Sequence, residues 1–151
     1  MKKLTLICFL ITISLFTTAQ EYNLKNYGLK ADSNFLQTKT IQKVIDKAAA
    51  KGGGTIIIPK GTYLSGALFF KKKTKLVLQE GAVLKGSDEI KNYPFIASRM
   101  EGKSLKYFAA LINAYQLDGF SINGPGTING NGLNFWKTFW AHRDSLRKIG
   151  K

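Results

Sequence analysis

Carboxylate side chains are the groups in this sequence best suited to catalysis. Among the nine acidic residues of the 151-residue chain, only Asp88 and Glu89 are adjacent. Two carboxyl groups that face the same bond can act as general acid and general base. Neighbours on an extended strand point to opposite faces, so this pair would not converge on one bond. The sequence therefore predicts no catalytic residue. The acidic residues are Glu21, Asp32, Asp46, Glu80, Asp88, Glu89, Glu101, Asp118 and Asp144.

Histidine, cysteine and glycine offer no clear alternative chemistry. His142 is the sole histidine, and between Arg143 and Asp144 it has no visible catalytic partner. Cys8 is the sole cysteine and lies in an apolar N-terminal run, so no disulfide or thiol site is expected. The glycine run at 124–132 lacks the Lys-Ser/Thr pair of a phosphate-binding loop. We therefore expect no metal site and no cofactor.

Positive charge dominates the sequence, with 23 Lys and Arg against nine Asp and Glu and a formal net charge of +14. The densest basic cluster is Lys71, Lys72, Lys73 and Lys75. Such a cluster could be the footprint of an acidic polymer, or a solvated turn whose lysines protect a strand edge. The sequence contains no zinc-ligand spacing, recognition-helix pattern or aromatic RNA-binding signature, so nucleic acid is not the expected partner.

The first 19 residues have the pattern of a secretory signal peptide. Lys2 and Lys3 precede an apolar run over residues 4–16, and small residues end at Ala19. The run is too short for a typical membrane span, although a membrane anchor is the alternative. We expect a secreted or periplasmic protein with no membrane association after cleavage. Loss of the two lysines lowers the net charge from +14 to +12.

An internal repeat organises the middle of the chain. Residues 55–66 align with residues 75–86 at an offset of 20 without a gap, each copy with two short β-prone runs around a glycine turn. One such unit cannot bury its apolar face alone, so stacked units must bury each other's. The repeat predicts an all-β parallel β-solenoid in which Ile57 lies above Val77, with Ile57 assigned to the core face. An antiparallel meander is the alternative.

Other patterns flank this repeat. Apolar residues recur at helical spacing over residues 38–51, with Thr38 as a candidate N-cap and Gly52 as a stop. Such a helix would cover the open end of a solenoid. The remaining predicted elements are a strand from Tyr22 to Gly28, a third strand face at 68–70, a loop over 88–107, further coils over 108–132 and a weak helix over 134–149.

Three segments carry a family resemblance. They are the run AAAKGGGTIIIPKGTYLSGALFFKKKTKLVLQEGAVLKGS, the later run GPGTINGNG and Trp136. The block from Ile41 to Gly132 resembles the N-terminal part of glycoside hydrolase family 28, the polygalacturonase family, with Asn129 where that family usually has aspartate. The resemblance implies a right-handed parallel β-helix with a capping α-helix, part of an enzyme that hydrolyses galacturonic acid linkages of pectin with inversion.

The resemblance also bears on sites and partners. The family carries its catalytic residues in motifs that read Asn-Thr-Asp, Asp-Asp, Gly-His-Gly and Arg-Ile-Lys, and none of these occurs here. Residues 20–151 are therefore expected to be the N-terminal part of a longer domain, truncated on its C-terminal side. The expected partner is an acidic polysaccharide, and the full-length protein is expected to be a monomer.

Substrate-binding residues stay unassigned at this level. Tyr93, Phe95 and Tyr107 could stack on sugar rings or could simply hold the 88–107 loop in place. Two other function classes also fit the sequence. A pectate lyase-like enzyme would need clustered acids for calcium and a basic group for proton abstraction, and a non-catalytic carbohydrate-binding solenoid would need neither.

Overall fold

The structure, a computed structural model, describes residues 20–148 with the exception of residue 101. The predicted signal peptide, residues 1–19, lies outside the described residues. The side chains of Met100, His142 and Leu146 lie outside them as well. Within the described part of the chain, no helix is long and apolar enough to cross a membrane.

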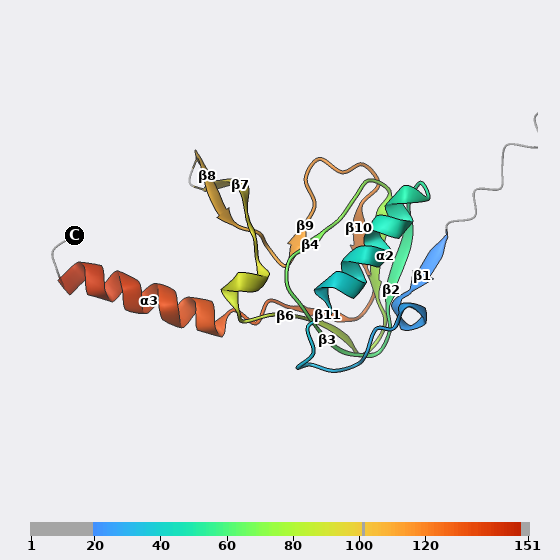
Figure 1. Cartoon of the computed structure of the whole chain (residues 1–151), viewed down its shortest axis with the longest axis horizontal. Coiled ribbons are helices and arrows are strands. Elements are labelled where there is room, and N and C mark those ends of the chain that lie inside the picture. The colour runs from blue at the N-terminus through green and yellow to red at the C-terminus, as the bar shows by residue number, and fades with distance from the viewer. Residues whose placement is uncertain (1–19, 101, 149–151) are drawn as a thin grey trace, which may run out of the picture.

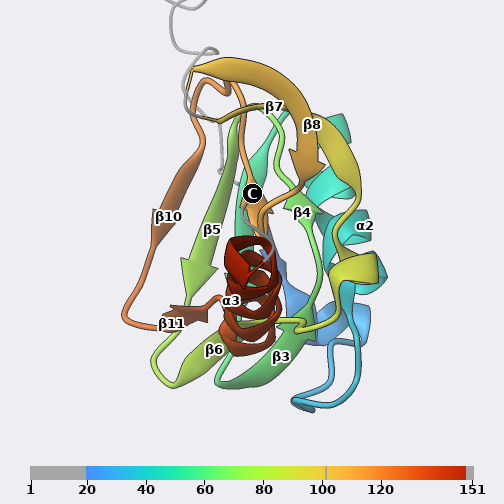
Figure 2. The same cartoon turned by 90° about the vertical axis from the view of Figure 1, so that its left-hand side faces the viewer.

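Short strands stack into three sheets that form the sides of a coil, as Figure 2 shows. The first sheet contains β1 (Glu21–Asn23), β2 (Gly54–Ile58), β5 (Thr74–Leu78) and β10 (Ser121–Asn123), in this spatial order. The second contains β3 (Gly61–Ser65), β6 (Ala82–Gly86) and β11 (Thr127–Asn129), and the third contains β4 (Leu68–Phe69) and β9 (Ile112–Asn113). Every pairing in these three sheets is parallel, so the predicted parallel β-helix is confirmed.

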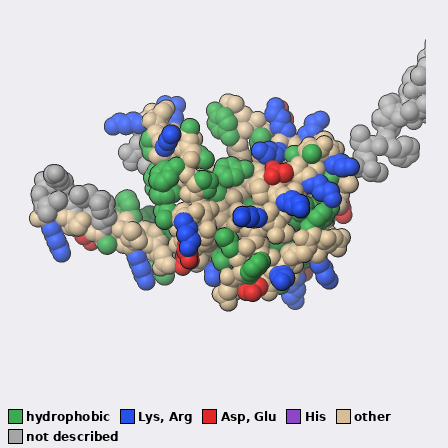
Figure 3. Space-filling view, viewed as in Figure 1, with side chains coloured by type: hydrophobic (Ala, Val, Ile, Leu, Met, Phe, Trp, Pro, Cys, Tyr) green, Lys and Arg blue, Asp and Glu red, His purple; other side chains and the backbone are tan. Residues whose placement is uncertain are grey.

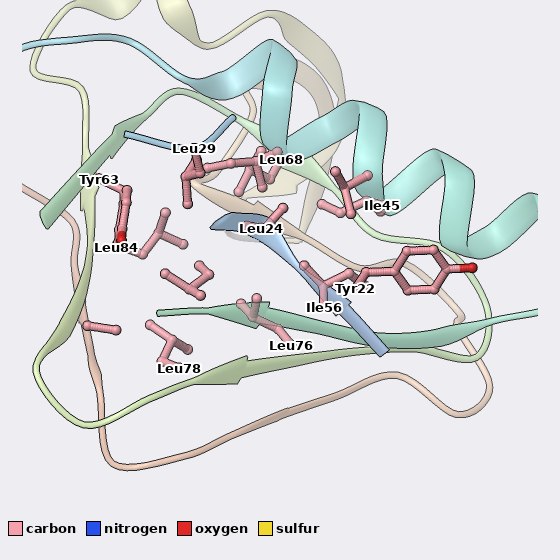
Figure 4. Packing of buried hydrophobic residues seen from close by; sticks show 14 of the residues in the cluster. Tyr22, Leu24, Leu29, Ile45, Ile56, Tyr63, Leu68, Leu76, Leu78 and Leu84 are labelled. Atoms are coloured by element: carbon pink, nitrogen blue, oxygen red, sulfur yellow. The ribbon is translucent and has the colours of Figure 1, made fainter. Parts of the chain in front are cut away.

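The core lies inside the coil and is filled by alternate residues of the strands (Figure 4). Ile56 of β2 pairs with Leu76 of β5, and both side chains are fully buried. Ile57 and Val77 pair as predicted, but both are only half-buried. The assignment of Ile57 to the core face was therefore wrong by one residue, because neighbouring side chains on a strand point to opposite faces.

The second sheet corrects the predicted gapless repeat. Tyr63 of β3 pairs with Leu84 of β6, not with Val83 as an offset of 20 requires. Residues 59–60 join β2 to β3, whereas residues 79–81 join β5 to β6. The second turn is thus longer by one residue, which moves the register of the second sheet by one position relative to the first.

The helix α2 (Thr38–Ala50) packs an apolar face onto the core, as its sequence spacing predicted. Its buried residues are Ile41, Val44, Ile45 and Ala48. The predicted N-cap was wrong, because the helix begins at Thr38 itself and Gln37 occupies the cap position without a side-chain cap hydrogen bond. Gly52 follows the last turn at φ +89°, a left-handed conformation that suits glycine and stops the helix.

Two polar side chains of α2 bond to the backbone of the third side of the coil. Thr38 Oγ1 accepts a hydrogen bond from the N–H of Gly66 (2.6 Å). Gln42 bonds both the N–H and the carbonyl oxygen of Phe69 in β4. Since β4 pairs with β9 on its other side, α2 covers a strand edge that would otherwise be open.

The N-terminal strand is shorter than predicted. β1 ends at Asn23, and the next residues form the 3-10 helix η2 (Leu24–Tyr27). The Asn23 side chain accepts a hydrogen bond from the N–H of Lys25 (3.0 Å), which caps the 3-10 helix and ends the strand. The predicted strand as far as Gly28 was therefore wrong.

Two segments extend beyond the coil (Figure 1). The predicted loop over 88–107 contains the 3-10 helix η3 (Ile90–Asn92) and an antiparallel hairpin of β7 (Phe95–Met100) and β8 (Lys103–Phe108). The second segment is α3 (Leu133–Lys148), which confirms the weak helix predicted over 134–149 within the described residues. In Figure 1, α3 projects away from the coils below the hairpin.

Candidate functional site

The hairpin and α3 leave the coil at the same corner, between the second and third sheets. In the first coil, Gly66 and Ala67 alone cross this corner from β3 to β4. In the next coil the chain crosses it through η3 and the hairpin, and α3 begins after β11. Gly86 and Gly130 meet closely there, since a Cβ on Gly86 would lie 2.7 Å from the carbonyl oxygen of Gly130. The corner of the β-helix between the second and third sheets therefore carries both the hairpin and α3.

A groove of about 710 Å³ lies between the hairpin and α3, and we call it the aromatic groove. Tyr107 from β8 and Trp136 and Phe139 from α3 line it, together with the polar side chains of Asp88 and Asn134. Trp136 is 58% exposed, and its ring stacks on that of Trp140 with centroids 5.9 Å apart. Exposed aromatic faces beside a few polar groups suit the binding of a sugar ring.

The three aromatic residues singled out in the sequence have different environments. Tyr93 is buried, donates a hydrogen bond from its hydroxyl to the carbonyl oxygen of Ser87 (2.8 Å) and packs edge-on against Phe135. Burial raises the pKa of the Tyr93 hydroxyl. Sugar stacking by this residue is excluded, because its ring holds the loop onto the coil.

Phe95 and Tyr107 are both accessible, and Tyr107 lines the aromatic groove. Phe95 packs against Phe108 across the hairpin, with centroids 4.2 Å apart. Tyr107 is 43% exposed and faces the aromatic groove. Stacking on a sugar therefore stays a hypothesis for Tyr107, and Trp136 and Phe139 join it as candidates that the sequence did not single out for binding.

The adjacent acids do not share a site. Asp88 Oδ2 accepts a hydrogen bond from Asn134 Nδ2 (2.6 Å), whereas Glu89 forms an ion pair with Lys91. Among the residues whose positions are described, no group of three or more His, Cys, Asp or Glu residues could hold a metal ion. Candidate His142 and the acid at position 101 cannot be placed, because they lie outside the described side chains.

The lysine cluster in the sequence forms an exposed turn between β4 and β5. Lys72 pairs with Asp118 at 3.5 Å, and both side chains are largely exposed. The N–H of Lys73 donates to the carbonyl oxygen of Asp118 (2.8 Å). An exposed pair of this kind contributes little to stability, which fits a solvated turn. Figure 3 shows basic side chains spread over the face in view rather than gathered into one patch.

Comparison with known proteins places this coil in a family. Residues 22–139 match the family described as rhamnogalacturonase A/epimerase, pectate lyase-like. The chain belongs to this family. The match includes the coils, the hairpin and the groove-lining part of α3, so the resemblance noted in the sequence is confirmed.

Relatives of this pectate lyase-like chain are considerably longer. It is 34% identical over 145 residues to the exo-poly-alpha-D-galacturonosidase of Dickeya chrysanthemi, a match that covers 89% of this chain and 23% of the relative. The family 28 exopolygalacturonase of Yersinia enterocolitica superimposes with a TM-score of 0.68 at 36% identity, covering 76% of this chain and 21% of that one. The exopolygalacturonase of Thermotoga maritima gives a TM-score of 0.70 at 25% identity, with 75% and 25% covered. The chain thus spans about a quarter of these relatives.

A second groove of the pectate lyase-like coil was not anticipated from the sequence. It has a volume of about 480 Å³ and lies between α2, β4 and the segment around η3. Lys39 and Lys43 of α2 line one side, and Phe69, Asn92 and Pro94 line the other. The only sequence signal is two lysines four residues apart on a helix, which is common on solvated helix surfaces. We call this feature the lysine groove.

Proposed function

We propose that this chain is the N-terminal segment of a secreted, polygalacturonase-like glycoside hydrolase that cleaves pectic polysaccharide with inversion. The observation that carries the proposal is the match of residues 22–139 to the pectate lyase-like family, together with relatives named for action on galacturonan. In this proposal residues 1–19 direct export, and the full-length protein is a monomer.

The catalytic acid and base belong, in this proposal, to coils outside residues 20–151. Inverting hydrolysis needs two carboxyl groups about 6.5–9.5 Å apart on either side of the bond. Asp88 and Glu89 have separate partners, Asn134 and Lys91, and neither faces the other across a groove. The chain spans 23% of the Dickeya chrysanthemi relative, which leaves room for such coils in a longer protein.

The proposed contribution of this segment is to cover one end of the β-helix and to attract the substrate. After loss of Lys2 and Lys3 with residues 1–19, the formal net charge of +12 complements a polymer of galacturonate, whose units carry carboxylates. Exposed charges are screened within about 10 Å at 0.1 M salt. Binding to polygalacturonate should therefore weaken steeply as the salt concentration rises, and binding that does not change with salt would contradict this part.

An assay of reducing ends tests the enzymatic assignment. The chain of residues 20–151 is compared with a version extended through the rest of its coding sequence, with polygalacturonate as substrate. We expect turnover by the extended protein alone. Turnover by the short chain that is lost on substitution of one of its acids would place the catalytic residues within this segment and contradict the proposal.

The same assay separates the competing function classes. A non-catalytic carbohydrate-binding solenoid is also consistent with the separate partners of Asp88 and Glu89, and it predicts binding by the extended protein without any release of reducing ends. A lyase predicts calcium-dependent release of an unsaturated product that absorbs ultraviolet light. Hydrolysis predicts saturated products and activity that persists in a chelator.

A further inference from the structure

The lysine groove is built from three parts of the chain that the coil holds together. α2 supplies Lys39 and Lys43, one helical turn apart and therefore about 6 Å apart along the helix axis. β4 supplies the half-buried ring of Phe69, and the end of η3 and the residues after it supply Asn92 and Pro94. Figures 1 and 2 show α2 beside β4 in both views.

The position of the two lysines is fixed by their neighbours on α2. Thr38 and Gln42, which flank Lys39 and Lys43 on the helix, bond to the backbone of Gly66 and Phe69. The opposite face of α2 is buried in the core. The helix therefore cannot turn its lysine-bearing side away from the groove without breaking these contacts.

Both lysines are available to a ligand. Lys39 and Lys43 are exposed, and neither takes part in an ion pair with any residue that the structure describes. One carboxylate, that of Asp46, also lines the groove, but it accepts a hydrogen bond from Gln42 Nε2 (3.0 Å) and lies further along the helix. Two cations against one carboxylate leave the groove with a positive charge that an anionic ligand would balance.

The opposite wall suits the remainder of a sugar unit. Phe69 and Pro94 present apolar surface on which the C–H groups of a pyranose ring can pack. The Asn92 amide nitrogen donates to Ser87 Oγ (2.7 Å), which orients the side chain. The backbone carbonyl oxygen of Asn92 accepts from the N–H of Ala67 (3.1 Å), whereas its side-chain oxygen Oδ1 has no hydrogen-bond partner among the described residues and can accept from a sugar hydroxyl.

We propose that the lysine groove binds a carboxylate-bearing sugar unit of an acidic polysaccharide, with Lys39 and Lys43 on the carboxylate and Phe69 beneath the ring. This inference rests on the proposed function, because pectic chains are the acidic polysaccharide in question. It assigns to α2 a role in substrate binding in addition to covering the edge of β4.

A pair of double variants tests the groove directly. In the full chain, Lys39→Gln with Lys43→Gln removes two charges from the groove, and Lys71→Gln with Lys72→Gln removes two charges from the exposed turn. Titration with a de-esterified oligogalacturonate at low salt gives the affinity of each protein, and circular dichroism checks that each is folded. We expect the groove variant to bind about five- to thirtyfold more weakly, and the turn variant to change by less than about threefold.

A second ligand separates recognition of the carboxylate from general attraction. The same oligomer with its carboxylates methyl-esterified should bind the unsubstituted chain weakly, and the groove variant should bind it no less tightly than the unsubstituted chain does. Equal losses for the two double variants would overturn the inference and leave the proposed substrate intact. Absence of any binding to oligogalacturonate by the unsubstituted chain would instead contradict the proposed function.

Discussion

Gln42 bonds both backbone groups of Phe69. Its Oε1 accepts from the Phe69 N–H (2.8 Å), and its Nε2 donates to the Phe69 carbonyl oxygen (2.9 Å). A neighbouring strand of the third sheet would make the same pair of contacts. A single helical side chain thus replaces a strand at the edge of β4.

Gln42→Leu should destabilise the fold by about 1–3 kcal/mol for each backbone group that loses its partner without access to water. The free energy of unfolding from urea denaturation measures this loss. Lys43→Ala is the control, since Lys43 is exposed on the same helix and should change stability by less than about 0.5 kcal/mol. Equal effects of the two substitutions would show that the edge contacts do not matter.

Two neighbouring isoleucines of β2 should respond very differently to truncation. Ile56 is fully buried, whereas Ile57 is half-buried on the other face of the strand. Ile56→Ala should cost about 2–5 kcal/mol, because it removes buried methyl groups and leaves a cavity. Ile57→Ala should cost less than half as much in the same denaturation experiment. The reverse order would restore the core face assigned from the sequence alone.

The sequence was sufficient to predict the parallel β-helix but not the pairing register of every sheet. Apolar runs identify β2, β5, β3 and β6, and the step of 20 residues is correct for the first sheet. In the second sheet, Tyr63 could meet either Val83 or Leu84, since both are apolar and one residue apart. Only the length of the turn at residues 79–81 decides between them, and turn length is set by the backbone path rather than by the hydrophobic pattern.

The grooves were harder to predict because distant segments form them. Tyr93 and Tyr107 look equivalent in the sequence, yet Phe135 covers only the first of them. The lysine groove likewise needs Phe69 and Asn92 beside α2, and the stacking of coils brings them there. Side chains that only the tertiary structure brings together leave no local signal.

Tyr93 should make stability depend on pH in the alkaline range. Burial raises the pKa of its hydroxyl above the ordinary value of 10.0, and the nearby carboxylate of Asp88 acts in the same direction. Above pH 10 the unfolded chain loses this proton first, so the folded state becomes less favoured as pH rises toward the higher folded-state pKa. Below pH 10 the contribution is constant.

Urea denaturation between pH 8 and pH 11 measures this effect in the unsubstituted chain and in Tyr93→Phe. The alkaline loss of stability should be smaller in the variant, which has no hydroxyl to ionise at this position. Burial also raises the pKa of Tyr63, but that residue is present in both proteins and cancels in the comparison. Parallel pH profiles would mean that Tyr93 ionises equally in the folded and unfolded states.

Gly124 and Gly130 form a matched pair on either side of β11. Gly124 has φ +102°, and a Cβ added to it would overlap the backbone carbonyl of Leu78. Gly130 lies outside the left-handed region, and a Cβ there would meet nothing within 4 Å. Gly124→Ala should therefore lower the free energy of unfolding by at least about 2 kcal/mol, through backbone strain and the clash with Leu78 of β5.

Gly130→Ala should be nearly neutral, or stabilising by a few tenths of a kcal/mol, because alanine restricts the unfolded chain without straining the folded one. The comparison isolates the close approach of Gly124 to Leu78 in β5, since both substitutions add the same methyl group to the same part of the chain. Thermal or urea denaturation of the two variants measures it. If Gly124→Ala were tolerated as well as Gly130→Ala, the segment between β10 and β11 would not pack against Leu78 as the structure has it, and the stacking of the last coil would have to be revised.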